Sequence, residues 1–461
     1  MMKRKKVLLI SPGLSKSIFA TFRTLEPGHP LGLAYLAAVL EKNNVQVRIF
    51  DNHTLKKPYK CIIDSLSEFP ADVVGIACTT ATYLSCISVA SLIRKYYPDK
   101  IIVSGGPHPT LFPKQMLKTG FFDAVFVGEA ESALCDFVLS DSIDEWKDIK
   151  GIVFKQAGEF ISTGKPEPIA NLDDLPMPAR HLLPMHKYPK VIGLLDVSPV
   201  YSINSSRGCP YSCSFCSCRI VGGPGFRSFS PGYIVDEIEY LINKYRARGI
   251  YFRENCFTAN PKRVIELCYL IKKRKIDIQW VCESRVDTID EDIVREMAQA
   301  GCRSIWFGVE TGSERVLETI AKKNTVKKKI VEAFALCKKY RIKTGASIML
   351  GLLGETKKEM YETLDFANRL DPYWSWFIPY RCMPGSEMYN MVIKKGCYDK
   401  INEGGTVCLK TDEFDERKLK RITFDICLKY LFSNPKRILR YLTELFRIGF
   451  SIENIRARLE S

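Results

Sequence analysis

The feature of the sequence that most constrains its fold is a repeated alternation of short apolar runs with amphipathic segments. In the first part of the chain, five runs rich in Val and Ile alternate with segments of helical periodicity; the runs span residues 7–10, 45–51, 73–78, 101–106 and 124–128. Short apolar runs between helical patterns are typical of buried parallel strands. Residues 1–145 are therefore expected to form an α/β domain with a doubly wound, Rossmann-like parallel sheet.

The same alternation resumes near residue 200 and continues for six units. The expected strands span residues 200–206, 249–254, 278–285, 303–310, 343–351 and 374–381. Two of the helices between them are expected to begin at Pro231 and Pro261, because proline suits the first helical turn, where its missing donor costs nothing. Six consecutive parallel units predict a partial (β/α)6 barrel over residues 196–386, with its binding site at the carboxyl ends of the strands.

Two segments do not follow this alternation. Residues 146–195 show little periodicity and are crowded with proline, which resists helix, so they are expected to form a linker. Residues 387–461 are basic and have helical periodicity, so they predict a small helical C-terminal region. A length of 461 residues agrees with several such units, because it exceeds what one ordinary core accommodates.

The cellular compartment is inferred from what the sequence lacks. No apolar run reaches the ~18–20 residues that span a bilayer, and the apolar part of the N-terminus is too short for a signal peptide. We therefore expect a cytoplasmic protein, whose 17 cysteines are thiols or metal ligands rather than disulfides. The net charge of +16 suits an acidic partner, and equally a solvated basic surface with no specific partner.

Three cysteines in one short segment carry the clearest chemical signal. Cys209, Cys213 and Cys216 have the spacing CxxxCxxC and follow the first strand of the second array. Iron–sulfur clusters are held by cysteine thiolates, normally four, so a loop with three leaves one iron open to a cofactor or substrate. Zinc is an alternative, with Cys218 as a fourth ligand, although structural zinc usually takes two separated ligand pairs. Buried thiols that bind no metal are a third interpretation.

With this motif the chain resembles the radical S-adenosylmethionine enzymes, in particular the cobalamin-dependent, class B methyltransferase type with an N-terminal cobalamin-binding domain. The resemblance implies that the three cysteines bind a [4Fe-4S] cluster whose open iron is chelated by S-adenosylmethionine. Electron transfer then cleaves this cofactor to methionine and a 5′-deoxyadenosyl radical. Phe215 matches the aromatic residue that the family places before the third cysteine. The resemblance identifies no catalytic side chain.

Segments at the later strand ends extend the resemblance over about residues 198–386. Glu254 and Asn255 match the paired acidic residues of the FxDDxFT segment, which contact the amino group of S-adenosylmethionine. Arg285, in a segment similar to TRVD, is expected to reach its carboxylate. Glu310 lies in a segment similar to GVESGS and Gly351 in one similar to GLPGET, which imply contacts to the ribose or aminocarboxylate end and to the adenine side. Taken singly, the charged residues could equally form structural ion pairs, and the glycines ordinary turns.

The N-terminal unit resembles the cobalamin-binding domains fused to these enzymes, through the segments PLGLAYLA, SGGPHPT and VGEAE. The residues expected at the cobalamin lie at strand ends: Thr79, Thr80, Gly105, Gly106 and His108. Adjacent glycines let the backbone approach a large planar ligand, although the same geometry would serve a nucleotide. The DxHxxG element that supplies an axial histidine in other cobalamin proteins is absent. We therefore expect no protein histidine on cobalt, and a loop-ordering role for His108.

The resemblance implies methylation of an unactivated carbon, with one S-adenosylmethionine methylating cobalamin and a second supplying the radical. One alternative is a radical cyclisation or rearrangement in which cobalamin transfers no methyl group. Another is a tRNA methylthiotransferase, whose second set of cluster cysteines has no match in the N-terminal unit. A protein of a different class, a metal-stabilised nucleic-acid binder, would bind RNA or DNA in a salt-dependent way without turnover. We do not expect a nucleic acid as partner.

The motifs name neither the substrate nor the electron donor. We expect a small molecule or lipid as substrate and a reductant such as flavodoxin or ferredoxin. Residues 438–447 place apolar side chains at helical spacing beside arginines. This pattern suits a helix on an anionic membrane surface, and thus peripheral membrane contact, and it equally suits a helix that packs against its own barrel.

Overall fold

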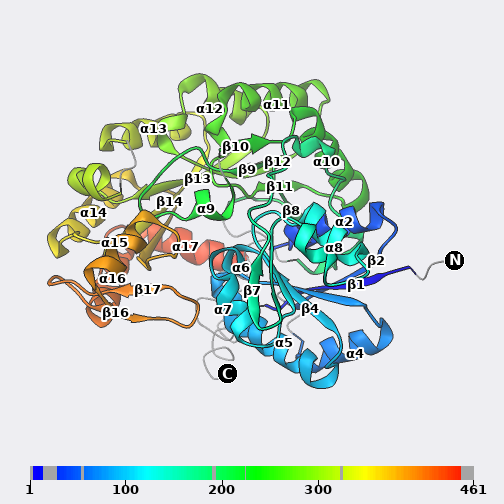
Figure 1. The fold of residues 1–461 in the computed structure, drawn as a ribbon. Coiled ribbons are helices and arrows are strands. Elements are labelled where there is room, and N and C mark those ends of the chain that lie inside the picture. The colour runs from blue at the N-terminus through cyan, green and yellow to red at the C-terminus, as the bar shows by residue number, and fades with distance from the viewer. Residues whose placement is uncertain are drawn as a thin grey trace.

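The structure, a computed structural model, describes residues 4–13, 28–52, 57–188, 194–223, 225–321 and 325–447. Figure 1 shows two α/β units: the N-terminal unit, blue to cyan, lies below the second unit, green to yellow, and an orange to red C-terminal region lies beside them. The α/β architecture predicted from the two arrays is confirmed. Across the described ranges, every helix is too short or too polar to cross a membrane.

The N-terminal unit contains a seven-stranded sheet in the order β2-β1-β3-β4-β5-β6-β7. Its first five strands are parallel: β1 (Lys6–Ser11), β2 (Gln46–Asp51), β3 (Val73–Ala77), β4 (Ile101–Gly105) and β5 (Ala124–Phe126). One face packs against α2 (Leu31–Lys42) and α8 (Glu131–Leu139); the other packs against α4 (Lys60–Glu68), α5 (Tyr83–Tyr96) and α7 (Pro113–Lys118). Alternate strand residues enter the two cores, as Leu8 and Leu9 do, because side chains along a strand point to opposite faces.

The segment 146–195, which we expected to be a linker throughout, contains two strands. β6 (Ile152–Gln156) pairs antiparallel with β5, and β7 (Glu159–Ser162) pairs antiparallel with β6. A tight turn joins them, with Ala157 and Gly158 both at positive φ, as two-residue hairpin turns require. The sheet of the N-terminal unit therefore extends to Ser162, and the helical turns within the described linker residues 163–188 are short turns of 3-10 helix.

The second sheet has six parallel strands in the order β15-β14-β13-β12-β11-β8. They are β8 (Val200–Ile203), β11 (Gly249–Phe252), β12 (Gln279–Ser284), β13 (Cys302–Glu310), β14 (Lys343–Leu350) and β15 (Trp374–Pro379). The outer helices are α10 (Pro231–Tyr245), α11 (Pro261–Lys273), α12 (Glu291–Gln299), α13 (Lys327–Lys339) and α14 (Lys357–Leu370). Because β8 and β15 are both edge strands, the sheet is the partial barrel that the sequence predicts.

Polar caps determine where the barrel helices begin. Ser230 and Asn260 each accept a hydrogen bond from a backbone N–H three residues on, and each precedes a proline in the first helical turn. Asp290 caps α12 in the same way, and Thr356 forms a reciprocal capping box with Glu359 at the start of α14. Such caps satisfy backbone donors that have no partner within the helix. They fix the loops at the carboxyl edge of the barrel, where the candidate site lies.

The described part of the C-terminal region, residues 387–447, contains three helices and one hairpin that the sequence analysis did not predict; residues 448–461 of the predicted helical region lie outside the described residues. Its helices are α15 (Glu387–Lys395), α16 (Glu416–Phe432) and α17 (Pro435–Arg447), and its hairpin pairs β16 (Tyr398–Ile401) with β17 (Val407–Leu409). The hairpin forms because Val407 and Leu409 are buried in the core of the second unit. Its loop reaches the N-terminal unit, where the Glu403 carbonyl accepts a hydrogen bond of 3.0 Å from Gln115.

Helix α17 has one face against the barrel and one face in solvent. Arg437 is buried and donates a hydrogen bond of 2.8 Å to Asp371, and the ring of Tyr441 lies 4.3 Å from that of Trp374. Leu439 and Leu442 are exposed on the other face. The buried face agrees with the alternative in which this helix packs against its own barrel; the exposed leucines leave the membrane expectation as a prediction.

Candidate functional site

The three motif cysteines lie in one loop at the carboxyl end of the first barrel strand. The loop runs from β9 (Ser206–Gly208) to α9 (Cys218–Val221), and Cys209, Cys213 and Cys216 are each half-buried in it. Gly208 has a φ of +80°, and a Cβ there would lie 2.2 Å from the Gly225 carbonyl oxygen. Only glycine therefore permits the turn that directs the chain into the first cysteine.

The side chain of Arg285 holds the cysteine loop. Its guanidinium donates to the sulfur of Cys213 at 3.3 Å and lies 3.9 Å from the ring centroid of Tyr211. Burial opposes the charge of Arg285, but the paired Asp287 outweighs this and raises the pKa of the guanidinium. Arg285, predicted to reach the S-adenosylmethionine carboxylate, thus lies at the cysteine loop with a permanent positive charge beside a sulfur.

Within the described residues, no three His, Cys, Asp or Glu side chains surround one point closely enough to bind a single metal ion. A cubane does not require this, because each cysteine of a [4Fe-4S] cluster bonds a different iron. Cys218 lies beside the loop: its thiol donates to the side-chain oxygen of Asn255 at 3.3 Å, and its backbone N–H lies 3.5 Å from the sulfur of Cys216.

The two residues matched to the family's acidic pair point in different directions. The carboxylate of Glu254 accepts hydrogen bonds from Ser205 and Ser206 and lies 3.6 Å from Arg263. Asn255 is exposed and lies against the cysteine loop, where its amide nitrogen is 3.5 Å from the Gly208 carbonyl oxygen. Contact of either residue with S-adenosylmethionine remains a prediction, and of the two Asn255 lies nearer the loop.

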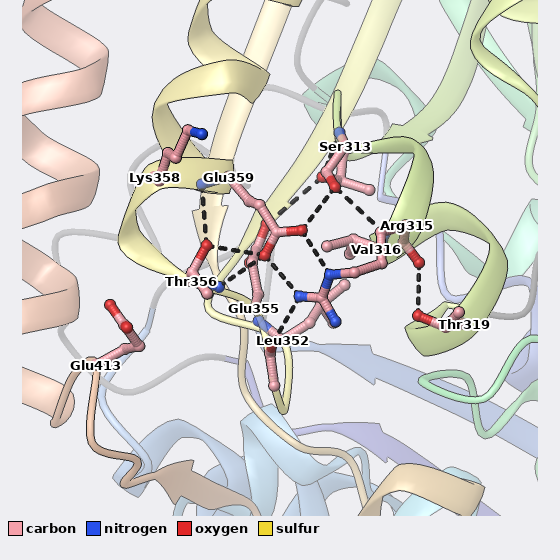
Figure 2. Close-up of polar contacts among 12 residues, drawn as sticks. Ser313, Arg315, Val316, Thr319, Leu352, Glu355, Thr356, Lys358, Glu359 and Glu413 are labelled. Atoms are coloured by element: carbon pink, nitrogen blue, oxygen red, sulfur yellow. Dashed lines mark hydrogen bonds and ion pairs between the residues drawn. The ribbon is translucent and has the colours of Figure 1, made fainter.

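A buried polar network supports the loops that follow β13 and β14 (Figure 2). Glu359 accepts hydrogen bonds from Ser313 at 2.9 Å and from Arg315 at 2.6 Å, and it also receives the backbone N–H of Thr356 at 3.0 Å. Burial opposes its ionisation, but the hydrogen bonds from Arg315 and Thr356 outweigh this and lower the pKa of Glu359 to about 2. This charged anchor on α14 fixes the loop after β13.

Glu310 and Gly351 end the strands that this network supports. Glu310 is buried and has a φ of +67°, a conformation that costs energy for any residue with a side chain and that clusters at functional sites. The Gly351 N–H donates to Glu355 at 2.6 Å, and a Cβ at Gly351 would lie 2.6 Å from Leu419. Burial raises the pKa of Glu355 to about 7. Both predicted residues therefore lie at the carboxyl edge of the barrel, and their cofactor contacts remain predictions.

The predicted cobalamin residues divide into two sets. Thr79, Gly105 and Gly106 line a cavity at the strand ends of the N-terminal sheet. Gly106 has a φ of +114°, and a Cβ there would lie 2.8 Å from a backbone carbonyl oxygen. Only glycine therefore fits at this position in the cavity wall. Thr80 and His108 do not line this cavity as the described residues define it.

His108 is buried between aromatic rings rather than exposed at the cavity. Its ring centroid lies 4.6 Å from that of Tyr83 and 5.2 Å from that of Phe112. Burial lowers its pKa to about 4, so the ring is neutral near pH 7. Thr80 lies close to the C-terminal hairpin instead: a Cβ on Gly404 of that hairpin would be 2.9 Å from the carbonyl oxygen of Thr80. These positions agree with the loop-ordering role expected for His108.

One cavity of about 960 Å³ crosses the boundary between the two units. On the N-terminal side it is lined by the ends of β1, β3 and β4 and by the start of α2, including Ser11, Thr79 and Gly106. On the barrel side it is lined by the inner face of the strands, namely Tyr251, Arg253, Glu283, Trp306, Ser347, Trp374 and Trp376. The strand ends predicted for cobalamin and the lumen of the barrel thus open into one space.

Ion pairs across the boundary between the two units connect the N-terminal strand ends predicted to bind cobalamin to the cysteine loop. Arg207, two residues before the first motif cysteine, lies 2.6 Å from Glu131 and 3.3 Å from Glu129. Arg227 pairs with Glu129 at 2.7 Å. Burial opposes ionisation of Glu129, but the hydrogen bond from Arg227 and the charge of Arg207 outweigh it and lower its pKa. The VGEAE segment therefore has a structural role between the units.

The sequence analysis missed the aromatic wall of the barrel, although a signal was present. Trp374 and Trp376 are two residues apart in β15, and residues two apart along a strand share a face. The spacing of Trp306 and Glu310 gives no such signal, because a bulge between Gly308 and Glu310 interrupts the alternation. Arg207 gave no comparable signal, because its partners lie some 75 residues earlier in another domain.

Comparison with known proteins gives matches to both units. The family model described as the radical SAM superfamily matches residues 203–367, and the model described as the B12 binding domain matches residues 20–138. An uncharacterized methyltransferase of Pyrococcus horikoshii is 33% identical over 397 residues, which cover 85% of this chain and 84% of the relative. Cytidylyl-2-hydroxyethylphosphonate methyltransferase of Streptomyces wedmorensis is 26% identical over 460 residues, covering 86% of this chain and 83% of that protein.

A similar arrangement of both units exists among solved structures. The cobalamin-dependent S-adenosylmethionine radical enzyme OxsB, solved with aqua-cobalamin bound, superposes with a TM-score of 0.76 at 17% sequence identity. The match covers 94% of this chain and 67% of that chain. At this identity the likeness concerns the fold, which both proteins share across the N-terminal sheet and the barrel.

Proposed function

Because the chain belongs to the radical S-adenosylmethionine superfamily and carries a B12-binding domain, we propose that it methylates an unactivated carbon of a hydrocarbon-rich small molecule or lipid. The comparisons confirm the family that the motifs indicated, and with it an enzyme of the methyltransferase kind. Its cofactors are a [4Fe-4S] cluster, S-adenosylmethionine and cobalamin. The substrate class is the part of the proposal that goes beyond these matches.

The described residues fit these cofactors. Three half-buried thiols share one loop beside the charge of Arg285, and Gly106, where positive φ and close contact with the neighbouring backbone admit only glycine, lines the cavity. When bound, the cluster and S-adenosylmethionine supply the radical and cobalamin supplies the methyl group. The chain itself orients these groups and excludes water from reactive species, which depends on rigid loops at the carboxyl edge of both sheets.

The continuity of the cavity is the observation that carries the proposal. Methyl transfer requires the methyl donor and the substrate carbon to share one space that the radical centre can reach, and Arg207, two residues before Cys209, lines this cavity. The 960 Å³ cavity joins the strand ends of the B12-binding unit to the lumen of the barrel, and it lies in the size range of ligand sites.

The wall of the barrel lumen supports a hydrocarbon-rich substrate. Three of the five tryptophans in the chain line it and remain half-buried, and the rings of Trp306 and Trp376 lie 4.9 Å apart. The polar atoms of the wall already bond one another: the Trp306 indole N–H donates to Ser347 at 2.5 Å, and the Tyr251 hydroxyl donates to Glu283 at 2.6 Å. What the wall offers a ligand is therefore mainly apolar and aromatic surface.

The charges of the cavity argue against a phosphorylated substrate. Among the described lining residues, the charged ones are Arg207, Arg253, Glu129, Glu131 and Glu283, so carboxylates outnumber guanidiniums. Both Glu129 and Glu131 pair with Arg207. The excess positive charge of the chain thus lies outside this cavity. We assign that excess to contact with an acidic electron donor of the flavodoxin or ferredoxin type, since opposite charge speeds association.

The test is turnover by the anaerobically reconstituted enzyme. The protein is loaded with iron, sulfide and hydroxocobalamin, reduced with flavodoxin, and given S-adenosylmethionine with farnesol, indole or adenosine monophosphate as probe. We expect farnesol or indole to stimulate release of 5′-deoxyadenosine and to gain a methyl group, and adenosine monophosphate to do neither. Cys213→Ala should abolish release, whereas Cys268→Ala, in the buried face of α11, serves as the matched control.

Two results would contradict the proposal. Stimulation by adenosine monophosphate alone would overturn the hydrocarbon substrate class. A cyclised or rearranged product that carries no new methyl group, formed with cobalamin retained, would replace methyl transfer by the radical cyclisation considered from the sequence. Loss of activity in Cys268→Ala equal to that in Cys213→Ala would show that the assay reports folding rather than the cluster.

A further inference from the structure

The open edge of the barrel is capped by side chains from outside the barrel. Strand β8 has a neighbour on one side only, so the backbone groups of Ser202 face away from the sheet. The Ser202 N–H donates to Nδ1 of His29 at 3.2 Å, and its carbonyl accepts a hydrogen bond of 2.6 Å from Arg180. Unpaired strand edges are usually covered in this way. His29 thus joins the start of the N-terminal helix α2 to the barrel.

This contact fixes the protonation of the imidazole. A backbone N–H can only donate, so the His29 nitrogen that faces Ser202 must be the unprotonated acceptor. A neutral imidazole carries one proton, which must then lie on the other nitrogen, Nε2. Burial, and then the charges of Arg180 and Arg253, lower the pKa of His29 well below 6.5, so the doubly protonated form is absent near pH 7.

Among the residues that the structure describes, the resulting Nε2–H donor has no partner. His29 is 6% exposed, and no described residue accepts a hydrogen bond from Nε2. The ring lies edge-on to Tyr188, with centroids 4.1 Å apart, and the residue lines the cavity that crosses the two units. A buried donor without a partner is unfavourable, and a ligand in the cavity would offset this by supplying an acceptor.

The position of the donor indicates which ligand supplies that acceptor. His29 falls within the segment matched by the B12-binding model, and its neighbours Pro30 and Gly32 line the cavity together with Thr79 and Gly106. The rim of a corrin ring carries amide groups, whose carbonyl oxygens are strong acceptors. We propose that Nε2–H of His29 donates a hydrogen bond to an amide carbonyl on the corrin rim, and that His29 is not a ligand of cobalt.

Exclusion from cobalt follows from the same tautomer. A histidine binds a metal through an unprotonated nitrogen. In His29 that nitrogen, Nδ1, is already bonded to the Ser202 N–H, and the other nitrogen, Nε2, carries the proton. Coordination would therefore require loss of the contact that caps the barrel edge. The inference rests on cobalamin binding but not on methyl transfer.

The direct test measures the wild-type protein, and a variant is needed only to assign the resonance. The chain has five histidines, so selective ¹⁵N labelling of histidine gives few resonances, assigned with His29→Gln. We expect His29 to show the Nε2–H tautomer, and its Nε2 resonance to shift on addition of hydroxocobalamin but not of S-adenosylhomocysteine. A shift only with S-adenosylhomocysteine, or none when absorbance shows that the corrin has bound, would overturn the proposal.

Two further measurements separate hydrogen bonding from coordination. His29→Phe removes donor and acceptor and should weaken hydroxocobalamin binding about three- to tenfold. His29→Gln retains both and should stay within about twofold of wild type; the exposed His181→Gln is the matched control. With reduced cobinamide, which lacks the benzimidazole base, the electron paramagnetic resonance spectrum should show no nitrogen splitting. Such splitting, or unchanged affinity in His29→Phe, would contradict the proposal.

The outcomes distinguish this inference from the proposed function. A shifted Nε2 resonance in an enzyme that methylates none of the probes would leave the role of His29 intact and refute methylation of that substrate class. Methylation of a probe by an enzyme whose His29 resonance does not shift with bound corrin would refute the role of His29 and leave the proposed function intact.

Discussion

Replacement of Arg207 tests how the two units are held together. Its guanidinium lies between Glu129 and Glu131 at the end of the N-terminal sheet, two residues before Cys209. In Arg207→Met, Glu129 keeps its ion pair with Arg227, whereas Glu131, which is 7% exposed, loses its pair. The variant therefore leaves one buried carboxylate without its counter-charge at the boundary between the units.

The expected cost follows from burial. Removing one partner of a fully buried ion pair costs about 3–5 kcal/mol, because the other charge remains desolvated. The side chain of Arg207 is 17% exposed and that of Glu131 is 8% exposed, so we take a lower value of about 2–3 kcal/mol. The exposed Arg274, which pairs with Asp236 at 2.6 Å, provides the contrast. Arg274→Met should cost much less than Arg207→Met, because exposed ion pairs contribute little to stability.

The assay is urea unfolding of the cofactor-free protein, followed by circular dichroism. Arg207→Met should lower the free energy of unfolding by about 2–3 kcal/mol, and adding Glu131→Gln should recover part of the loss because the buried charge is then gone. We also expect slower reconstitution of the cluster, since the strand before Cys209 loses an anchor. A loss no larger than that of Arg274→Met, or no recovery in the double variant, would refute the reasoning.

Three further predictions concern other parts of the structure. Burial raises the pKa of Glu355 from 4.5 to about 7, so the folded state retains a proton that the unfolded chain releases; the free energy of unfolding should fall by up to about 3 kcal/mol between pH 4.5 and 7, and Glu355→Gln should remove this slope in urea titrations. Gly106→Ala should weaken hydroxocobalamin binding at least tenfold by spectral titration, whereas Gly105→Ala, whose Cβ would meet its nearest neighbour at 3.4 Å, should change it little. Wild-type protein should sediment with anionic vesicles and less so after Leu439→Ser and Leu442→Ser, which remove apolar surface without adding charge; equal sedimentation of both would contradict membrane contact by α17.

The parallel strands of both sheets were predictable because each is a short apolar run between two amphipathic helical segments. The predicted run 101–106, for example, differs from β4 by one residue. The hairpins were not predictable in the same way. β6 has only three buried residues, and β17 also has three, so neither gives a strong signal of its own. Such strands form because a sheet edge or a core elsewhere in the chain covers them.

The site was predictable to the extent that its chemistry depends on local spacing. The cysteine motif can be recognised from the sequence because it spans only eight residues, with Cys209, Cys213 and Cys216 as its members. His29 gives no such signal, because its role depends on the edge of β8, over 170 residues away. The role of Glu359 in the polar network was likewise not predicted, although the sequence indicates its capping box with Thr356. Contacts between domains depend on how the domains dock, which no local pattern encodes.

The docking of the two units explains why the cavity has two unlike walls. Parallel sheets present loops at the carboxyl ends of their strands, and ligands bind there. In this chain the carboxyl edge of the first sheet opens onto the lumen of the second, so Gly106 lines the same cavity as the aromatic wall of Trp306 and Trp376. The ion pair of Arg207 joins the two units at one place beside the cavity, and the hydrogen bond of His29 joins them at another, at strand β8. Neither domain alone would enclose the space. The chemistry of the barrel therefore depends on a boundary whose contacts are polar, directional and sensitive to single substitutions.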